Sequence, residues 1–193
     1  RTGYSAIADE WVPIRPGTDG ALLLAIIHEI IAQGLYDRDF LVRYTNAGQL
    51  VNLDEKSDEF GMFLRTEVPE EEGCFDPQNK LWWDRAGNKP VVTHTEGCDP
   101  FLLGEFNLAD GTPVKPSFQL LQERVKDYTP EWAEGLTGIP AATIKRLAYE
   151  MGVTARDQKI ELPIAWTDSW GKEHDTVTGN PVAFHAMRGL AAH

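Results

Sequence analysis

Hydrophobic residues are concentrated in one run near the start of the chain, GALLLAIIHEIIAQ at residues 20–33. Apolar side chains occupy most of the circumference that a helix over this run would have, which predicts a helix buried on most of its sides. Gly34 follows in the position where helices commonly end. His28 lies inside the run, where a buried ring is expected to be hydrogen-bonded as an ordinary polar group of the core.

A turn is predicted directly before this helix. Pro16 and Gly17 form a turn dipeptide, and Thr18 and Asp19 both carry the short oxygen-bearing side chain that caps helix N-termini. The first amide groups of a helix lack partners within the helix, so a carboxylate and several N–H groups would face the same space. This turn is the candidate site for binding.

Weaker periodicities predict the other elements. Residues 1–10 fit a turn and a short helix, and residues 11–14 a short edge strand interrupted by Pro13. Asp37 is placed to cap a helix over 38–44, and residues 50–53 are expected to form a strand. A helix is predicted at 117–125, with Ser117 as its cap. A second helix is predicted to start with Thr129 as its cap and Pro130 in its first position. A third is predicted at 140–151 and is expected to be closed by Gly152. The expected inward-facing residues are Phe40, Leu41, Tyr44, Phe118, Leu121, Val125, Ala141, Ile144, Leu147, Ala148 and Met151.

The pattern changes between these groups of elements. Acidic residues, Gly and Pro dominate 52–116, with hairpin turns expected at 83–89 and 108–112. After 151, the sequence predicts a strand at 159–166, a long polar loop at 167–180 and a helix at 181–193. The predicted parts are therefore 1–51, an irregular β excursion at 52–116, and 117–193, where helices and a strand return to the first part.

Composition narrows the classes of function. The net charge of −12, with 30 acidic against 18 basic residues, disfavours a nucleic-acid partner because phosphate binding needs clustered Lys and Arg. The longest apolar run is shorter than the ~20 residues that span a bilayer. Cys74 and Cys98 match no zinc or iron–sulfur spacing and are expected to be ordinary thiols.

One further cluster of titratable residues stands near the C-terminus. His174 occurs with Asp168, Glu173 and Asp175, which are residue types used in metal and acid–base sites. Because the four residues share one loop-like segment without helical spacing, a solvated loop is the preferred interpretation.

Three segments resemble one enzyme family. The turn and helix start IRPGTDGALLLA is similar to a segment of the molybdopterin oxidoreductases, the dimethyl sulfoxide reductase family. GLYDRDFLVRYTN at 34–46 and YTPEWAEGLTGIPAATIKRLA at 128–148 also resemble that family, in the same order. The resemblance implies an α/β fold, a partial doubly wound (Rossmann-like) domain of a larger subunit, with an irregular β-rich excursion. Residues 1–51 would then be part of the guanine-dinucleotide-binding domain.

The resemblance also implies site residues. Asp19 would bind the guanine of a molybdopterin guanine dinucleotide carrying molybdenum, while Pro16, Gly17 and Thr18 let the backbone approach it. The alternative is that Thr18 or Asp19 only caps the helix. His193, at the end of the segment GLAAH, would lie near the pterin. No metal ligand and no catalytic residue is assigned in this stretch, and a [4Fe-4S] cluster is expected elsewhere in the parent subunit.

The implied function is that of the central part of a catalytic subunit. Such enzymes transfer an oxygen atom or two electrons to or from a small-molecule substrate, and the best likeness is to the branch that acts on sulfite, thiosulfate or polysulfide. Expected partners are a ferredoxin-like iron–sulfur subunit, together with a membrane anchor subunit. The alternatives are a nitrate reductase-like or other branch of the family and a non-catalytic α/β scaffold. A nicotinamide or flavin dinucleotide binder is disfavoured because the chain has no G-x-G-x-x-G.

Overall fold

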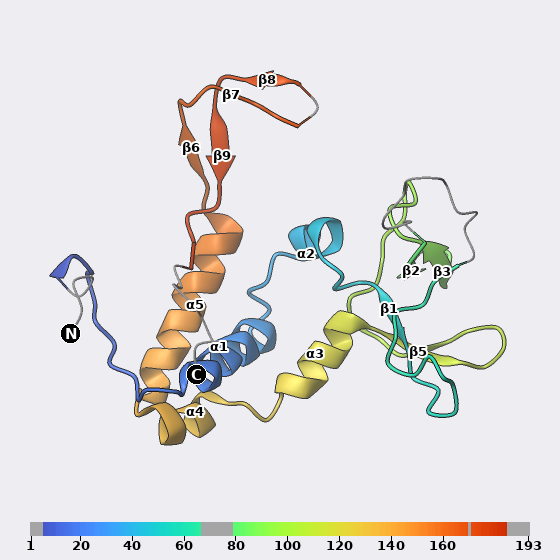
Figure 1. Cartoon of the computed structure of the whole chain (residues 1–193), viewed down its shortest axis with the longest axis horizontal. Coiled ribbons are helices and arrows are strands. Elements are labelled where there is room, and N and C mark those ends of the chain that lie inside the picture. Colours follow the sequence, from blue (N-terminus) through green and yellow to red (C-terminus); the bar gives the residue numbers. More distant parts are fainter. Residues whose placement is uncertain (1–5, 67–78, 170, 185–193) are drawn as a thin grey trace. The chain divides into compact units, whose positions relative to one another are not determined.

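The computed structural model of the chain describes residues 6–66, 79–169 and 171–184. The chain divides into two compact units (Figure 1). Unit 1 combines Arg1–Tyr36 with Val125–His193, and unit 2 is Asp37–Arg124. Unit 2 therefore includes more of the chain than the irregular stretch 52–116.

Three helices form the core of unit 1. They are α1 (Asp19–Ala32), α4 (Pro130–Thr137) and α5 (Ala141–Asp157). The residues buried at their common core are all Ala or Ile. The buried members of this core are Ala25, Ile26, Ala133, Ile139, Ile144 and Ala148.

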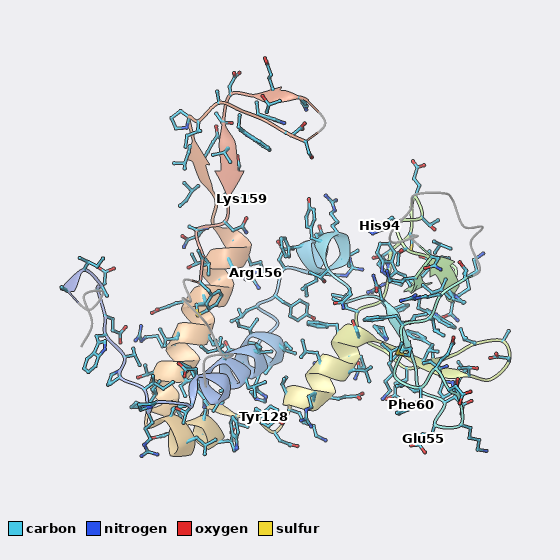
Figure 2. All side chains as sticks on the ribbon, in the orientation of Figure 1. Glu55, Phe60, His94, Tyr128, Arg156 and Lys159 are labelled. Carbon is cyan, nitrogen blue, oxygen red and sulfur yellow. The ribbon has the colours of Figure 1, made fainter. Side chains whose placement is uncertain are left out.

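Helix α1 begins and ends close to the predicted positions. Gly34 adopts a φ of +63°, and its N–H donates to the Ile31 carbonyl at 3.1 Å. The Leu35 N–H donates to the Ile30 carbonyl at 2.9 Å, so the left-handed glycine closes the helix as predicted. Arg156, near the end of α5 (Figure 2), donates from Nη1 to the Gly34 carbonyl at 3.2 Å.

The expectation that α1 is buried on most sides is wrong for the described residues. Its buried residues are Ala25, Ile26, Glu29 and Ile31. Apolar residues such as Leu23, Leu24 and Ile27 are only half-buried. The reason is that α4 and α5 cover one side of α1, whereas apolar periodicity alone cannot count the partners that a helix will have.

Helix α4 has both predicted N-terminal signals. The Thr129 side chain accepts a hydrogen bond from the Trp132 N–H at 3.2 Å, and Pro130 occupies the first helical position. Gly138 ends the helix with a φ of +77°, and its N–H donates to the Glu134 carbonyl at 2.9 Å. The predicted cap is confirmed because it depends only on local sequence.

Helix α5 shows that the role predicted for Gly152 is wrong. The helix continues through Gly152 to Asp157 instead of closing there. Gly152 is buried, and a Cβ placed on it would lie 2.7 Å from the Leu35 Cβ. This glycine therefore provides room for the chain that leaves α1, on the same face of α5 as Ile144 and Ala148.

The segment after α5 folds as two short antiparallel pairs (Figure 1). β6 (Ile160–Leu162) pairs with β9 (Val177–Gly179), and β7 (Trp166–Thr167) pairs with β8 (Glu173–His174). The predicted continuous strand 159–166 and the predicted polar loop 167–180 are thus both wrong, since sequence periodicity did not show where the chain folds back. Residues 181–184 are not helical, and 185–193 lie outside the described residues.

The predicted edge strand at 11–14 is also absent from the described structure. Val12 and Ile14 pack against the helical core of unit 1, and Trp11 and Pro13 face outward. Alternate residues of this segment thus face the core, but no neighbouring strand pairs with it in the part of the chain that the structure describes.

Unit 2 contains two helices and five strands in its described residues. α2 (Arg38–Tyr44) is capped by Asp37, whose side chain accepts from the Phe40 N–H at 2.9 Å, as predicted. β1 (Leu50–Asn52), β5 (Pro113–Pro116) and β4 (Phe106–Asn107) form an antiparallel sheet in the order β1-β5-β4. β2 (Leu81–Asp84) pairs with β3 (Lys89–Val92), and α3 (Ser117–Val125) follows β5 directly.

Both predicted hairpin turns of unit 2 are confirmed. Between β2 and β3, the Gly87 N–H donates to Asp84 Oδ2 at 2.6 Å, and Asn88 has a φ of +46°. Between β4 and β5, the Gly111 N–H donates to the Leu108 carbonyl at 2.9 Å. The core beneath these hairpins contains Leu50, Trp83 and Val114, with Trp83 stacked on Phe106 at 4.5 Å between centroids.

Three residues predicted to face inward are exposed. Phe40 and Tyr44 of α2 are 54% and 72% exposed, and they pack against one another with their centroids 5.2 Å apart. Leu121 of α3 is 40% exposed, whereas Phe118 and Val125 of the same helix are buried.

Ser117 is the first residue of α3, and its Oγ donates to the Asn46 and Ala47 carbonyls instead of capping the helix.

The described residues therefore form a mixed α/β structure with small antiparallel sheets. All strand pairs between residues 6 and 184, outside the gaps, are antiparallel. None of the described helices combines the length and apolar character needed to cross a bilayer.

Gly152 and Gly135, which lie in two helices of unit 1, provide a matched test of this packing. Gly152→Ala should lower the free energy of unfolding by about 1–3 kcal/mol, because its Cβ would meet the Leu35 side chain. Gly135→Ala in α4, where an added Cβ meets nothing within 4 Å, should raise it by about 0.5–1 kcal/mol. Chemical denaturation of both variants measures the difference, and equal effects at the two sites would contradict the described packing.

Candidate functional site

The predicted turn before α1 is present. The Thr18 N–H donates to the Arg15 carbonyl at 3.3 Å, and Gly17 has a φ of +80°. Proline followed by a residue with positive φ is the pattern of a type II turn, which explains the order of Pro16 and Gly17. A Cβ on Gly17 would meet nothing within 4 Å, so the backbone of the turn faces open space there.

Thr18 stabilises this turn and does not cap α1 through its side chain. Its hydroxyl donates to the Arg15 carbonyl at 2.7 Å, and α1 has no side-chain cap hydrogen bond. The Thr18 carbonyl accepts from the Ala21 and Leu22 N–H groups. The expectation that the Thr18 hydroxyl caps the helix is therefore wrong: the hydroxyl is turned toward the Arg15 carbonyl, and its oxygen accepts no cap hydrogen bond from an N–H of α1.

Asp19 is the first residue of α1 and is half-buried. A carboxylate in the first turn is stabilised by the positive end of the helix dipole. The structure therefore brings Pro16, Gly17, Thr18 and Asp19 together in one turn at a helix start. The fifth predicted site residue, His193, lies outside the described residues.

Arg15 joins this turn to α4, a contact that the sequence did not predict. Its Nη1 donates to the Gly135 and Leu136 carbonyls at 2.9 and 3.2 Å, and its backbone N–H donates to the Thr137 carbonyl at 3.0 Å. These are carbonyls at the C-terminal end of α4, where a guanidinium is favoured by the helix dipole. The turn is thereby fixed to the helical core of unit 1.

His28 has the structural role predicted for it. Its Nδ1 lies 2.9 Å from the Val125 carbonyl, which accepts a hydrogen bond from the ring. This bond satisfies a half-buried polar group in α1 and gives the ring no direct part in the turn at the other end of the helix.

Comparison with known proteins gives the family. No family model matches the chain. A sulfite dehydrogenase subunit of Allochromatium vinosum is 71% identical over all 193 residues, a match that covers 20% of that protein. The alpha subunit of the Dechloromonas aromatica perchlorate reductase is 35% identical over 74% of the chain and 18% of that protein. The chain belongs to the molybdopterin oxidoreductase family.

More distant members of this family also match. The molybdopterin-containing subunit of the arsenate respiratory reductase of Shewanella sp. is 25% identical over 96% of the chain and 16% of that protein. The chain spans about a fifth of the length of the first two relatives and less of the third. Their names describe each of them as one subunit of its enzyme, which indicates that these relatives work together with other subunits.

The cluster around His174 is ordered by its own hairpin. His174 Nε2 lies 3.1 Å from Asp168 Oδ2, and the ring stacks on Trp166 with centroids 4.6 Å apart. Asp168 Oδ1 accepts from the Lys172 N–H at 2.9 Å. The predicted solvated loop is therefore a β hairpin in which Glu173 is exposed, and the described side chains include no group of three or more candidate metal ligands.

Cys98 has an environment that its sequence spacing did not indicate. Burial is the main cause that raises the pKa of its thiol to about 11, followed by a hydrogen bond to Asp84 and the charges of Asp84 and Asp99. The Gly87 N–H and the Asp99 N–H bind Asp84, and they hold the pKa of that carboxyl below its ordinary value. Cys98 is therefore a poor nucleophile at neutral pH. Cys74 lies outside the described residues.

The pKa of Cys98 can be measured in a Cys74→Ser background. The rate of alkylation by iodoacetamide should keep rising to about pH 11. Asp84→Asn should lower the midpoint by about one pH unit, because the charge is removed while burial remains. Asp110→Asn, which changes a turn carboxylate in the β4–β5 hairpin, is the control. A midpoint near that of free cysteine in the Cys74→Ser protein, with Asp84 unchanged, would contradict this description.

Proposed function

We propose that the chain is the central part of the catalytic subunit of a molybdenum bis(molybdopterin guanine dinucleotide) oxidoreductase that acts on a sulfur compound. The observation that carries this proposal is the 71% identity, over all 193 residues, to a protein named as a sulfite dehydrogenase subunit. Relatives named for perchlorate, arsenate or dimethyl sulfoxide are 25–35% identical. The difference in identity favours sulfite among the substrates of the family.

The turn before α1 fits the guanine end of such a cofactor. Guanine presents N1–H and N2–H₂ side by side, and a carboxylate accepts from both in charge-assisted hydrogen bonds. Asp19 places its carboxyl group in the first turn of α1, at the positive end of the helix dipole. The positive φ of Gly17 and the open space above it allow a flat base to approach the backbone. His193 is proposed, from the family likeness, as a neighbour of the pterin.

In this proposal the described residues hold the cofactor and do not react. When bound, the molybdenum cofactor supplies two-electron and oxygen-atom chemistry. Oxidation of sulfite to sulfate takes its oxygen from water and releases two protons and two electrons. The ligand to molybdenum and a [4Fe-4S] cluster are proposed to lie outside this chain. The proposed partners for the electrons are a ferredoxin-like iron–sulfur subunit, together with a membrane anchor subunit.

We further propose that α1, α4 and α5 belong to a doubly wound, Rossmann-like domain in the complete subunit. The half-buried apolar side chains of α1, including Leu23, Leu24 and Ile27, support this proposal because α4 and α5 leave them partly uncovered. A parallel sheet, which is buried on both faces by helices, would cover such a surface.

Asp19 provides a direct test of cofactor binding in the full-length subunit. Asp19→Asn should lower the retained molybdenum and guanine nucleotide by about tenfold or more after dialysis, since the amide cannot accept both guanine donors. Metal analysis and nucleotide release on acid hydrolysis measure both quantities.

Asp37→Ala is the matched control, because it removes the helix cap of α2 without changing the turn. It should leave cofactor content unchanged and cost about 1 kcal/mol of stability. Cofactor loss of the same size in both variants, or in neither, would show that Asp19 does not bind the guanine. Full-length protein without any molybdenum would favour the non-catalytic scaffold.

The substrate class is tested with the intact enzyme. Sulfite should support reduction of an artificial acceptor such as ferricyanide at a kcat/KM at least ~100-fold above that for dimethyl sulfide, a difference of about 2.7 kcal/mol in transition-state stabilisation. In the reductive direction, nitrate, perchlorate and dimethyl sulfoxide should be poor oxidants of the reduced enzyme. Turnover of one of these compounds with no response to sulfite would instead assign another branch of the family.

A further inference from the structure

We infer that Arg15 is a positioning residue for the guanine-binding turn, acting through Asp19. The inference rests on the proposed function, since it concerns how accurately the Asp19 carboxylate is presented to a guanine base. It is carried by the contacts of Arg15 with α4 on one side and with Thr18 on the other. Arg15 itself does not need to touch the cofactor for this role.

The first step is the hydrogen bonding at the end of α4. A helix leaves its last four carbonyls without partners inside the helix. The Glu134 carbonyl accepts from the Gly138 N–H, and the Gly135, Leu136 and Thr137 carbonyls all accept from Arg15. Arg15 therefore supplies three of the four missing partners, although it lies at least 120 positions before these carbonyls in the sequence.

The second step is the link from Arg15 to α1. The Arg15 carbonyl accepts from both the N–H and the hydroxyl of Thr18. The Thr18 carbonyl in turn accepts from Ala21 and Leu22, which begin the hydrogen-bond ladder of α1. A continuous series of hydrogen bonds thus runs from the end of α4 through Arg15 and Thr18 to the helix that carries Asp19.

The third step concerns the glycine beside the guanidinium. Gly138 has a φ of +77°, and a Cβ placed there would lie 3.4 Å from Arg15 Nε. The positive φ is what requires a glycine at the end of α4, and the Arg15 side chain lies in contact distance of this residue. The turn at Pro16 and Gly17 is itself exposed. Because exposed loops are mobile unless they are anchored, the Arg15 contacts are expected to fix the turn that leads into Asp19, in addition to the packing of α1.

A bidentate hydrogen bond depends strongly on position, because both donors must align with both oxygens. Loss of the Arg15 side chain should therefore weaken cofactor binding even though no cofactor contact is removed. A residue that only caps α4 would affect the stability of unit 1 without this specific dependence on Asp19. The two roles can be separated by combining Arg15 and Asp19 variants.

The test uses the purified full-length subunit, from which the rate of molybdenum and guanine nucleotide loss is measured on dilution. Arg15→Ala should accelerate the loss by about tenfold, and Asp19→Ala by at least as much. The double variant should lose its cofactor no more than about twofold faster than Asp19→Ala alone. If Arg15→Ala does not accumulate as folded protein, Arg15→Lys replaces it, with an expected acceleration of about threefold.

Thr129→Ala is the matched control, because it removes the cap at the other end of α4. It should destabilise α4 while leaving the rate of cofactor loss within about twofold of the unchanged protein. Equal acceleration by Thr129→Ala and Arg15→Ala, or effects of Arg15 and Asp19 that multiply, would overturn the positioning role. An unchanged rate in Asp19→Ala would instead overturn the proposed guanine site, and the positioning role with it.

Discussion

The structure of unit 1 depends on small residues where its three helices cross. Ala25 of α1, Ala133 of α4 and Ala148 of α5 are completely buried, and Gly152 allows Leu35 to approach α5. Larger side chains at these positions would separate the helices, because protein interiors are packed without spare volume. The close crossing brings the end of α4 next to the start of α1, although these two ends are far apart in the sequence.

This proximity explains how an exposed turn acquires a defined position. The carbonyls at the end of α4 lack partners within the helix. The Arg15 guanidinium binds two of them and the Arg15 backbone N–H binds a third, from the chain just before α1. The same residue fixes the turn through its own carbonyl and Thr18. The proximity of the end of α4 to the start of α1 therefore serves three purposes. It lets the apolar helices pack, it gives the last carbonyls of α4 their partners, and it holds the turn that presents Asp19.

Sequence patterns predicted the features that are determined locally. Asp37 and Thr129 cap their helices, Pro16 and Gly17 form the turn, and the hairpins at 83–89 and 108–112 are present, because neighbouring residues decide these conformations. Features that depend on distant partners were missed. Gly152 follows the rule for a helix end but serves a contact with Leu35, and Phe40 and Tyr44 have helical spacing without a core to face. The Arg15 contacts with α4 and the folding back of 160–179 also required tertiary information, whereas resemblance to relatives identified the family.

The central claim is that Asp19 accepts both donors of a guanine base at the start of α1. The most direct measurement is an experimental structure of the full-length subunit with its cofactor. We expect the two Asp19 carboxylate oxygens to lie about 2.7–2.9 Å from guanine N1 and N2, with Arg15 on the carbonyls of α4. A guanine held by other residues, with the Asp19 carboxylate bonded only to its own backbone, would contradict this claim.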